Sequence, residues 1–130
     1  MISKEYMVEL DSRILGIHAR LKELHYSAPN MDIHKLTDEF IGELLDFEDR
    51  IMENLQPMPG AGFVAVGDLH PIVPDESTFK DVLTLVRGIA ADLKKQAGDA
   101  VMYSGVVSIV DDFFATINKY IYLVKIVEKK

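Results

Sequence analysis

Residues 57–76 read PMPGAGFVAVGDLHPIVPDE and interrupt a sequence that is otherwise helical in character. The segment has prolines at positions 57, 59, 71 and 74 and glycines at positions 60, 62 and 67. Because proline removes a backbone donor and glycine favours turns, the composition predicts an irregular connection here and no regular helix. Fully extended, this connection would reach roughly 66 Å.

Two amphipathic segments precede the connection, at residues 4–26 and 31–56. Both carry apolar side chains at alternating steps of three and four residues, which is typical of helices with one buried face. The intervening Ser-Ala-Pro-Asn, residues 27–30, has turn chemistry and predicts a helical hairpin. The apolar stripes are Met7, Leu10, Ile14, Ile17, Leu21 and Leu24 in the first segment, and Ile33, Leu36, Phe40, Leu44, Phe47, Ile51 and Leu55 in the second.

Two further helices are expected after the connection. Ser77 or Asp75 can cap a third helix that runs to Ala97, and Gly98 supplies its stop. Asp99 can then cap a fourth helix that continues to the C-terminus. The expected buried stripes are Phe79, Val82, Val86, Ile89 and Leu93 in the third helix, and Met102, Val106, Ile109, Phe113, Ile117, Tyr120, Val124 and Val127 in the fourth.

These elements predict one all-α domain over residues 1–130. The second helix would be roughly 37 Å long, so the extended connection can span the whole bundle. Helices two and three could therefore run in the same direction. Four helices with two short turns and one long central crossover form the ferritin-like arrangement. An up-and-down bundle with a loosely held loop is the alternative.

The composition and net charge exclude several kinds of site and binding partner. The 130 residues carry a net charge of −7, are 48% hydrophobic and include no cysteine. Disulfides, thiolate metal sites and thiol catalysis are thereby excluded. No apolar run reaches the length of a membrane span, and the acidic balance disfavours binding of nucleic acid through its phosphates. The charged N-terminal residues lack the apolar core of a secretory signal, so a cytoplasmic location is expected.

Nearly all of the net charge lies on the second helix. Residues 31–55 contain eight acidic side chains against two basic ones, a balance of −6. The rest of the chain contains 13 acidic and 12 basic side chains, a balance of −1. The charge is therefore a local property of one helix.

Three of these carboxylates, together with His34, define one narrow face, which we call the acidic arc. They are Asp38, Asp49 and Glu53. At about 100° of rotation per residue, the arc points roughly 150° away from the helix's own apolar stripe. The chain has no Glu-x-x-His motif of the kind that builds metal centres inside such bundles. Any metal bound by the arc would lie on the outward face, with ligands from a neighbouring subunit; the alternative is a solvated acidic face.

His25 lies at the end of the first helix, so the short turn brings it to the same end of the hairpin as His34. Imidazole and carboxylate ligands together suit Fe, Zn or Mn. His18 lies seven residues before His25 on nearly the same line and is interpreted as filling a polar groove.

The assembled residues resemble those of the Dps miniferritins, dodecameric relatives of ferritin. The matching elements are HY at 25–26, HKLTDEF at 34–40 and DRIME at 49–53. As in that family, fifteen positions separate His34 from Asp49, and four separate Asp49 from Glu53. The resemblance covers the first hairpin; the second half of the chain is similar only in helix lengths and in the long connection.

The resemblance implies a function and a partner. His25, His34 and Asp38 of one subunit would meet Asp49 and Glu53 of its two-fold partner. These five residues would bind Fe(II), which hydrogen peroxide would oxidise, and the ferric mineral would be stored in a hollow homo-oligomeric shell. The alternative is a catalytically silent shell or scaffold whose acidic arc makes salt bridges between subunits.

Other candidates stay open. Many family members bind DNA with a lysine-rich N-terminal tail, whereas here Lys4 is the one lysine at the start of the first helix. We therefore expect no strong binding of DNA. Asp68 and His70 in the connection, and Asp111 and Asp112 in the fourth helix, have no role that the sequence decides.

Overall fold

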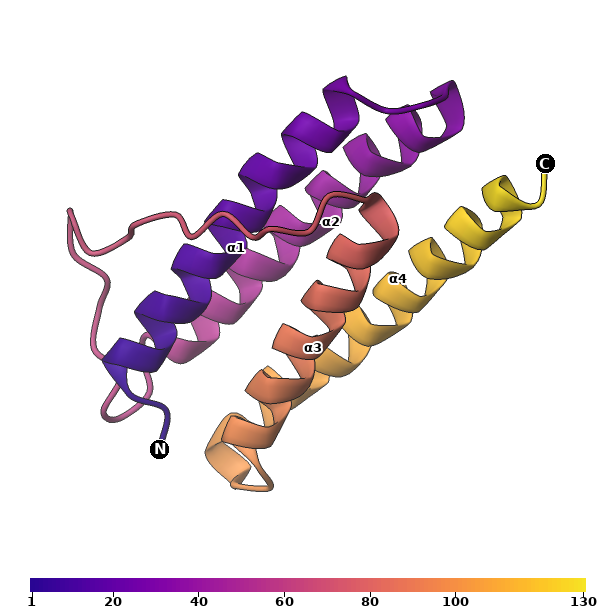
Figure 1. Cartoon of the computed structure of the whole chain (residues 1–130). Coiled ribbons are helices and arrows are strands. Elements are labelled where there is room, and N and C mark those ends of the chain that lie inside the picture. Colours follow the sequence, from indigo (N-terminus) through magenta and orange to yellow (C-terminus); the bar gives the residue numbers. More distant parts are fainter.

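The computed structural model describes residues 1–130 and is entirely helical (Figure 1). Its helices are α1 (Lys4–Tyr26), α2 (Met31–Leu55), α3 (Phe79–Ala97) and α4 (Ser104–Glu128), with a short 3₁₀ turn, η1 (Val101–Tyr103), before α4. The prediction of an all-α bundle of four helices is confirmed. None of the helices combines the length and the apolar character that a membrane crossing requires.

Side-chain caps explain where three of the helices begin. Ser3 accepts a hydrogen bond from the Tyr6 amide at the start of α1, and Asn30 accepts one from the Ile33 amide at the start of α2. Each cap satisfies a backbone donor that has no partner within its helix.

The cap expected for the third helix was wrong. Thr78, rather than Ser77 or Asp75, accepts a hydrogen bond from the Asp81 amide. Gly98 ends this helix as expected, in a left-handed backbone conformation with φ of 61°. Its amide donates to the carbonyl of Lys94.

The start of α4 also differs from the prediction. Asp99 does not cap the helix, and η1 comes between the two. Tyr103 is buried, and its hydroxyl accepts a hydrogen bond of 2.7 Å from the amide of Ile2. A contact with the N-terminus of the chain therefore accompanies this boundary. Met102, assigned to the buried stripe, is 37% exposed.

The helices pack as two antiparallel hairpins, α1 with α2 and α3 with α4 (Figure 1). Helix α2 also packs against α4, and α1 makes a looser contact with α3. An aromatic cluster fills the centre, where the Phe47 and Phe113 rings stack with centroids 4.0 Å apart and Phe40 packs edge-on to Tyr120. Burial of such large apolar side chains is the main source of stability in a bundle of this kind.

The long connection, residues 56–78, lies along α1 and reaches the start of α3 (Figure 1). The Ile72 amide donates to the Ser12 carbonyl at 3.0 Å, and the Arg20 guanidinium donates to the Pro74 carbonyl at 3.1 and 2.9 Å. Gly16 faces the Ile72 carbonyl so closely that a Cβ there would overlap it. The connection is therefore held on α1, and α2 and α3 run in the same direction.

Candidate metal-binding site

The turn between α1 and α2 brings His25 and His34 into direct contact. Their rings stack with centroids 3.9 Å apart and an interplanar angle of 19°. Nδ1 of His25 lies 2.7 Å from the carbonyl oxygen of His34, and Nδ1 of His34 lies 2.9 Å from the carbonyl oxygen of His25. Each histidine therefore binds the backbone of the other, and we call the two the histidine pair.

These contacts determine the tautomer of both rings. A carbonyl oxygen only accepts hydrogen bonds, so each Nδ1 must carry the proton and donate it. In the neutral imidazole, the lone pair is then on Nε2. No hydrogen bond of the structure uses either Nε2. An Nδ1–H held by a backbone carbonyl is the usual support of a histidine that ligates a metal through Nε2.

The Thr37 hydroxyl contacts both members of the histidine pair. This residue was not identified from the sequence. Its side chain is fully buried, and its hydroxyl oxygen lies 2.8 Å from the Ile33 carbonyl and 3.0 Å from the His34 carbonyl. Nδ1 of His25 lies 3.2 Å from the same hydroxyl. The signal that could have identified it is a polar residue on the inward side of an amphipathic helix, one turn after His34.

The carboxylates of the acidic arc are exposed on α2. Asp38, Asp49 and Glu53 all lie outside the apolar core, as the helical wheel predicts. None of them takes part in an ion pair within the chain. Asp49 and Glu53 are one turn apart, so their like charges repel unless a cation lies between them.

One chain does not bring all five predicted ligands together. Asp38 follows His34 by one helical turn, whereas Asp49 lies fifteen residues after His34, roughly 22 Å along the helix at 1.5 Å per residue. No group of three or more histidine and acidic side chains in the chain is arranged to hold a metal ion. Within a single copy, the histidine pair and the Asp49–Glu53 pair are therefore two separate half-sets of ligands.

The residues of the long connection whose roles the sequence did not decide make contacts within the chain. Asp68 closes the turn Ala65–Asp68, where its carboxylate accepts a hydrogen bond from the Ala65 amide and pairs with Lys4 at 3.2 Å. The hydrogen bond from the Ala65 amide lowers the pKa of Asp68, and the contact with Lys4 lowers it further. His70 is exposed, and its backbone amide donates to the Ser12 hydroxyl.

The two acidic residues of α4 are engaged at the surface. Asp111 pairs with Lys94 at 2.7 Å, and Asp112 lies 4.0 Å from Arg50. His18 is half-buried in the α1 helix, and burial, followed by the nearby Lys22, lowers its pKa. None of these residues joins the histidine pair.

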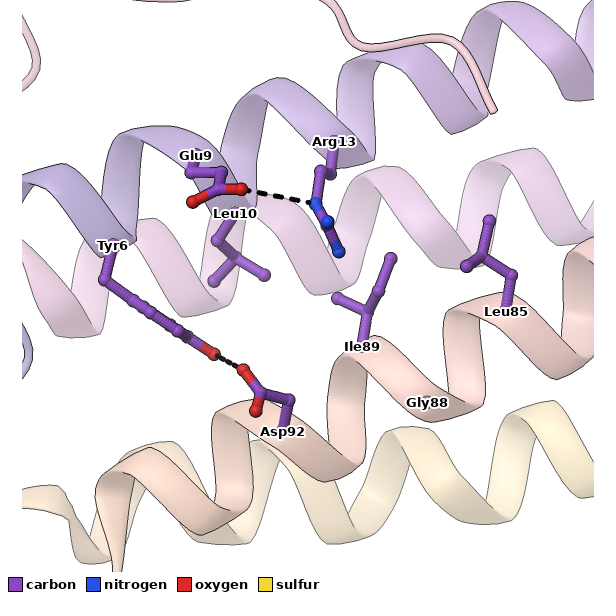
Figure 2. Close-up of a pocket in the computed structure, with 8 residues that line it drawn as sticks. All are labelled: Tyr6, Glu9, Leu10, Arg13, Leu85, Gly88, Ile89 and Asp92. Atoms are coloured by element: carbon purple, nitrogen blue, oxygen red, sulfur yellow. Dashed lines mark hydrogen bonds and ion pairs between the residues drawn. The ribbon is translucent and has the colours of Figure 1, made fainter. Parts of the chain in front are cut away.

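A groove of about 350 Å³ lies elsewhere, between α1 and α3 (Figure 2). Tyr6 reaches across it, and its hydroxyl donates a 2.6 Å hydrogen bond to the Asp92 carboxylate. Burial, followed by this bond, raises the pKa of Tyr6 well above its usual value. Leu10 and Ile89 form the apolar floor. The groove contains none of the five predicted ligands.

Comparisons of the chain with protein-family models, with curated proteins and with solved structures find no match. The assignment of function therefore depends on the histidine pair and the acidic arc themselves.

Proposed function

We propose that this chain is a Dps-like iron protein that oxidises Fe(II) with hydrogen peroxide. Its copies would assemble into a hollow, dodecameric shell of ferritin-like subunits, in which the long connection is the crossover between the second and third helices. Fe(II), the substrate, would bind where two copies meet, and the ferric product would be stored inside the shell. Zn or Mn could occupy the same ligands.

The reciprocal bonding of His25 and His34 is the observation that carries this proposal. Two imidazoles whose Nδ1–H groups are both held by backbone carbonyls keep two Nε2 lone pairs for a metal. The same bonds also close the turn, so the support for a metal role comes from the two Nε2 atoms, neither of which takes part in a hydrogen bond. The pair also lies one turn from Asp38, which adds a carboxylate on the same side of α2.

A two-fold pair of chains would complete the site. In a symmetric dimer each surface contacts its partner twice, in two equivalent places. If two copies of α2 lie antiparallel, the histidine pair of one chain meets Asp49 and Glu53 of the other at both places. The separation of the two half-sets along α2 is then a requirement of the site.

The chemistry balances without a further reactant. Each of two Fe(II) ions gives up one electron, and one molecule of hydrogen peroxide accepts both and, with two protons, becomes two molecules of water. Because both electrons pass together, no hydroxyl radical is released. Neutral imidazoles and carboxylates suit both iron oxidation states, and exposed ligands leave room for peroxide.

The test is a pair of charge-matched double variants. Asp49→Asn with Glu53→Gln should abolish rapid oxidation of Fe(II) by peroxide, followed by stopped-flow absorbance. Glu39→Gln with Glu43→Gln removes two charges at the same spacing on the same helix and should retain it. An unchanged rate in the Asp49–Glu53 variant would overturn the site assignment, and the absence of rapid oxidation in the wild type would favour the catalytically silent shell. A native mass of one 14.6 kDa chain would exclude a site shared between copies.

A further inference from the structure

Asp11 is an acidic side chain in the seam between α1 and α2. It is only 5% exposed, and its Oδ1 is buried with no hydrogen-bond partner. A buried carboxylate oxygen without a partner is costly, and nearly all such oxygens in folded proteins are hydrogen-bonded or bind a cation. The unpartnered Oδ1 of Asp11 therefore requires an explanation.

The residue opposite Asp11 is another acid. Glu48 of α2 is half-buried, and its carboxyl group is within hydrogen-bonding reach of the Asp11 carboxyl. Burial, followed by the Asp11 contact, raises the pKa of Glu48 to about 8. Two helices thus bring two carboxyl groups together inside the seam.

No basic side chain of the protein neutralises these two acids. Neither takes part in an ion pair. Nearby along the two helices, Arg13 pairs with Glu9, and Arg50 lies 4.0 Å from Asp112. The neighbouring Asp49 adds further negative charge beside Glu48. The seam therefore has a local deficit of positive charge.

We propose that the carboxylates of Asp11 and Glu48 bind a hard divalent cation of the Mg²⁺, Ca²⁺ and Mn²⁺ class between α1 and α2. Such cations prefer oxygen ligands, and carboxylates from two elements with water completing the shell are a common way to hold them. The ion neutralises both acids and gives the unpartnered Oδ1 of Asp11 a ligand role. It also links the two helices of the first hairpin.

This cation site uses different ligands from the proposed iron site. Asp11 precedes His25 by fourteen residues and Glu48 follows His34 by fourteen, which places both roughly 21 Å along the helices from the histidine pair. Asp49 directly follows Glu48, but its side chain is exposed, whereas Glu48 is half-buried. The ligands of the cation site are all oxygen, whereas the histidine pair supplies nitrogen. The inference therefore does not depend on the proposed function.

Binding of Mn²⁺ to the full chain, followed by electron paramagnetic resonance at pH 7.5, tests the site. We expect Asp11→Asn with Glu48→Gln to lose one Mn²⁺ per chain relative to wild type. Asp49→Asn with Glu53→Gln should retain that ion, which distinguishes this site from the acidic arc. Equal Mn²⁺ stoichiometry in wild type and in the Asp11–Glu48 variant would overturn the proposal, as would the absence of binding at millimolar Mn²⁺, which would leave a shared proton only.

Folding of the variants is measured in parallel. Both substitutions keep the side-chain shape and replace two buried ionisable groups with neutral amides, so the variant should melt at or above the temperature of the metal-free wild type. Mn²⁺ should raise the melting temperature of the wild type by more than it raises that of the variant, because the variant lacks this one site. If the double variant does not fold, Glu48→Gln alone serves, since Glu48 is half-buried, and it should weaken Mn²⁺ binding at least tenfold.

Discussion

His25 and His34 each donate a ring hydrogen bond to the other's backbone carbonyl, across a turn of eight intervening residues. The two histidines therefore form a single unit, joined by two bonds from ring to backbone and by the stacking of the rings. Because the carbonyls belong to the end of α1 and the start of α2, the same bonds hold the hairpin closed. The same two hydrogen bonds therefore position the proposed ligands and close the turn.

A mixing experiment tests whether the site is shared between chains. A variant with His25→Ala and His34→Ala and one with Asp49→Asn and Glu53→Gln should each be inactive in Fe(II) oxidation. Random co-assembly in equal amounts creates pairs in which one of the two sites has only native ligands. Recovery of about one quarter of the wild-type rate is expected from two-fold symmetry. A site within one chain would stay silent in every mixture.

Thr37→Val should disturb the histidine pair while preserving side-chain shape. The change removes the hydroxyl that contacts the Ile33 and His34 carbonyls, so we expect a loss of about 0.5 to 1.5 kcal/mol in the free energy of unfolding. The rate of Fe(II) oxidation should also fall. Thr84→Val is the control, because the Thr84 hydroxyl bonds only the Lys80 carbonyl on an exposed face. An unchanged oxidation rate in Thr37→Val would contradict a positioning role.

Gly16→Ala should loosen the long connection. The added Cβ would overlap the Ile72 carbonyl, so the connection must shift, at a cost of about 1 to 3 kcal/mol in unfolding free energy measured by urea denaturation. Gly88→Ala is the matched control in another helix, since a Cβ there meets no atom within 4 Å. It should stabilise the protein by about 0.5 to 1 kcal/mol. Equal effects at the two positions would show that Gly16 is not under the connection.

His18 should make the stability of the protein depend on pH. Its pKa is lowered in the folded state, mainly by burial, so the unfolded chain takes up its proton first. The contribution of neutral His18 to the unfolding free energy is therefore fully present above the unfolded pKa of about 6.5. It is lost as the pH falls below that value. Wild type should lose more unfolding free energy between pH 7.5 and 5.5 than His18→Gln does. Parallel pH profiles would assign the loss to other groups.

The sequence predicted the helices well where local signals agree. The bounds of α1 match the expected residues, and α2 ends one residue earlier, because apolar periodicity and a capping side chain coincide there. The cap of α3 was predicted wrongly because Asp75, Ser77 and Thr78 are all residues that can cap a helix. The start of α4 could not be found locally, because it involves the contact between Tyr103 and the N-terminus.

In the candidate site, too, local sequence patterns predicted some features, whereas features that depend on tertiary contacts were missed. Helical periodicity places Asp38, Asp49 and Glu53 on one exposed face, and the structure agrees. That His25 and His34 lie at one end of the hairpin also followed from the short turn. Their exchange of hydrogen bonds did not, because it depends on the exact path of the turn. Asp11 was missed because its position in an apolar seam is visible only after α1 and α2 are packed.

The contacts of the long connection join residues far apart in sequence, such as Ser12 with Ile72 and Arg20 with Pro74. The contacts within each hairpin are closer in sequence and should form first. The connection then acts as a tether that gives the two hairpins a high effective concentration for one another. Cleavage in the turn Ala65–Asp68 would make their docking a reaction between two molecules, and the stability of the bundle would then vary with protein concentration.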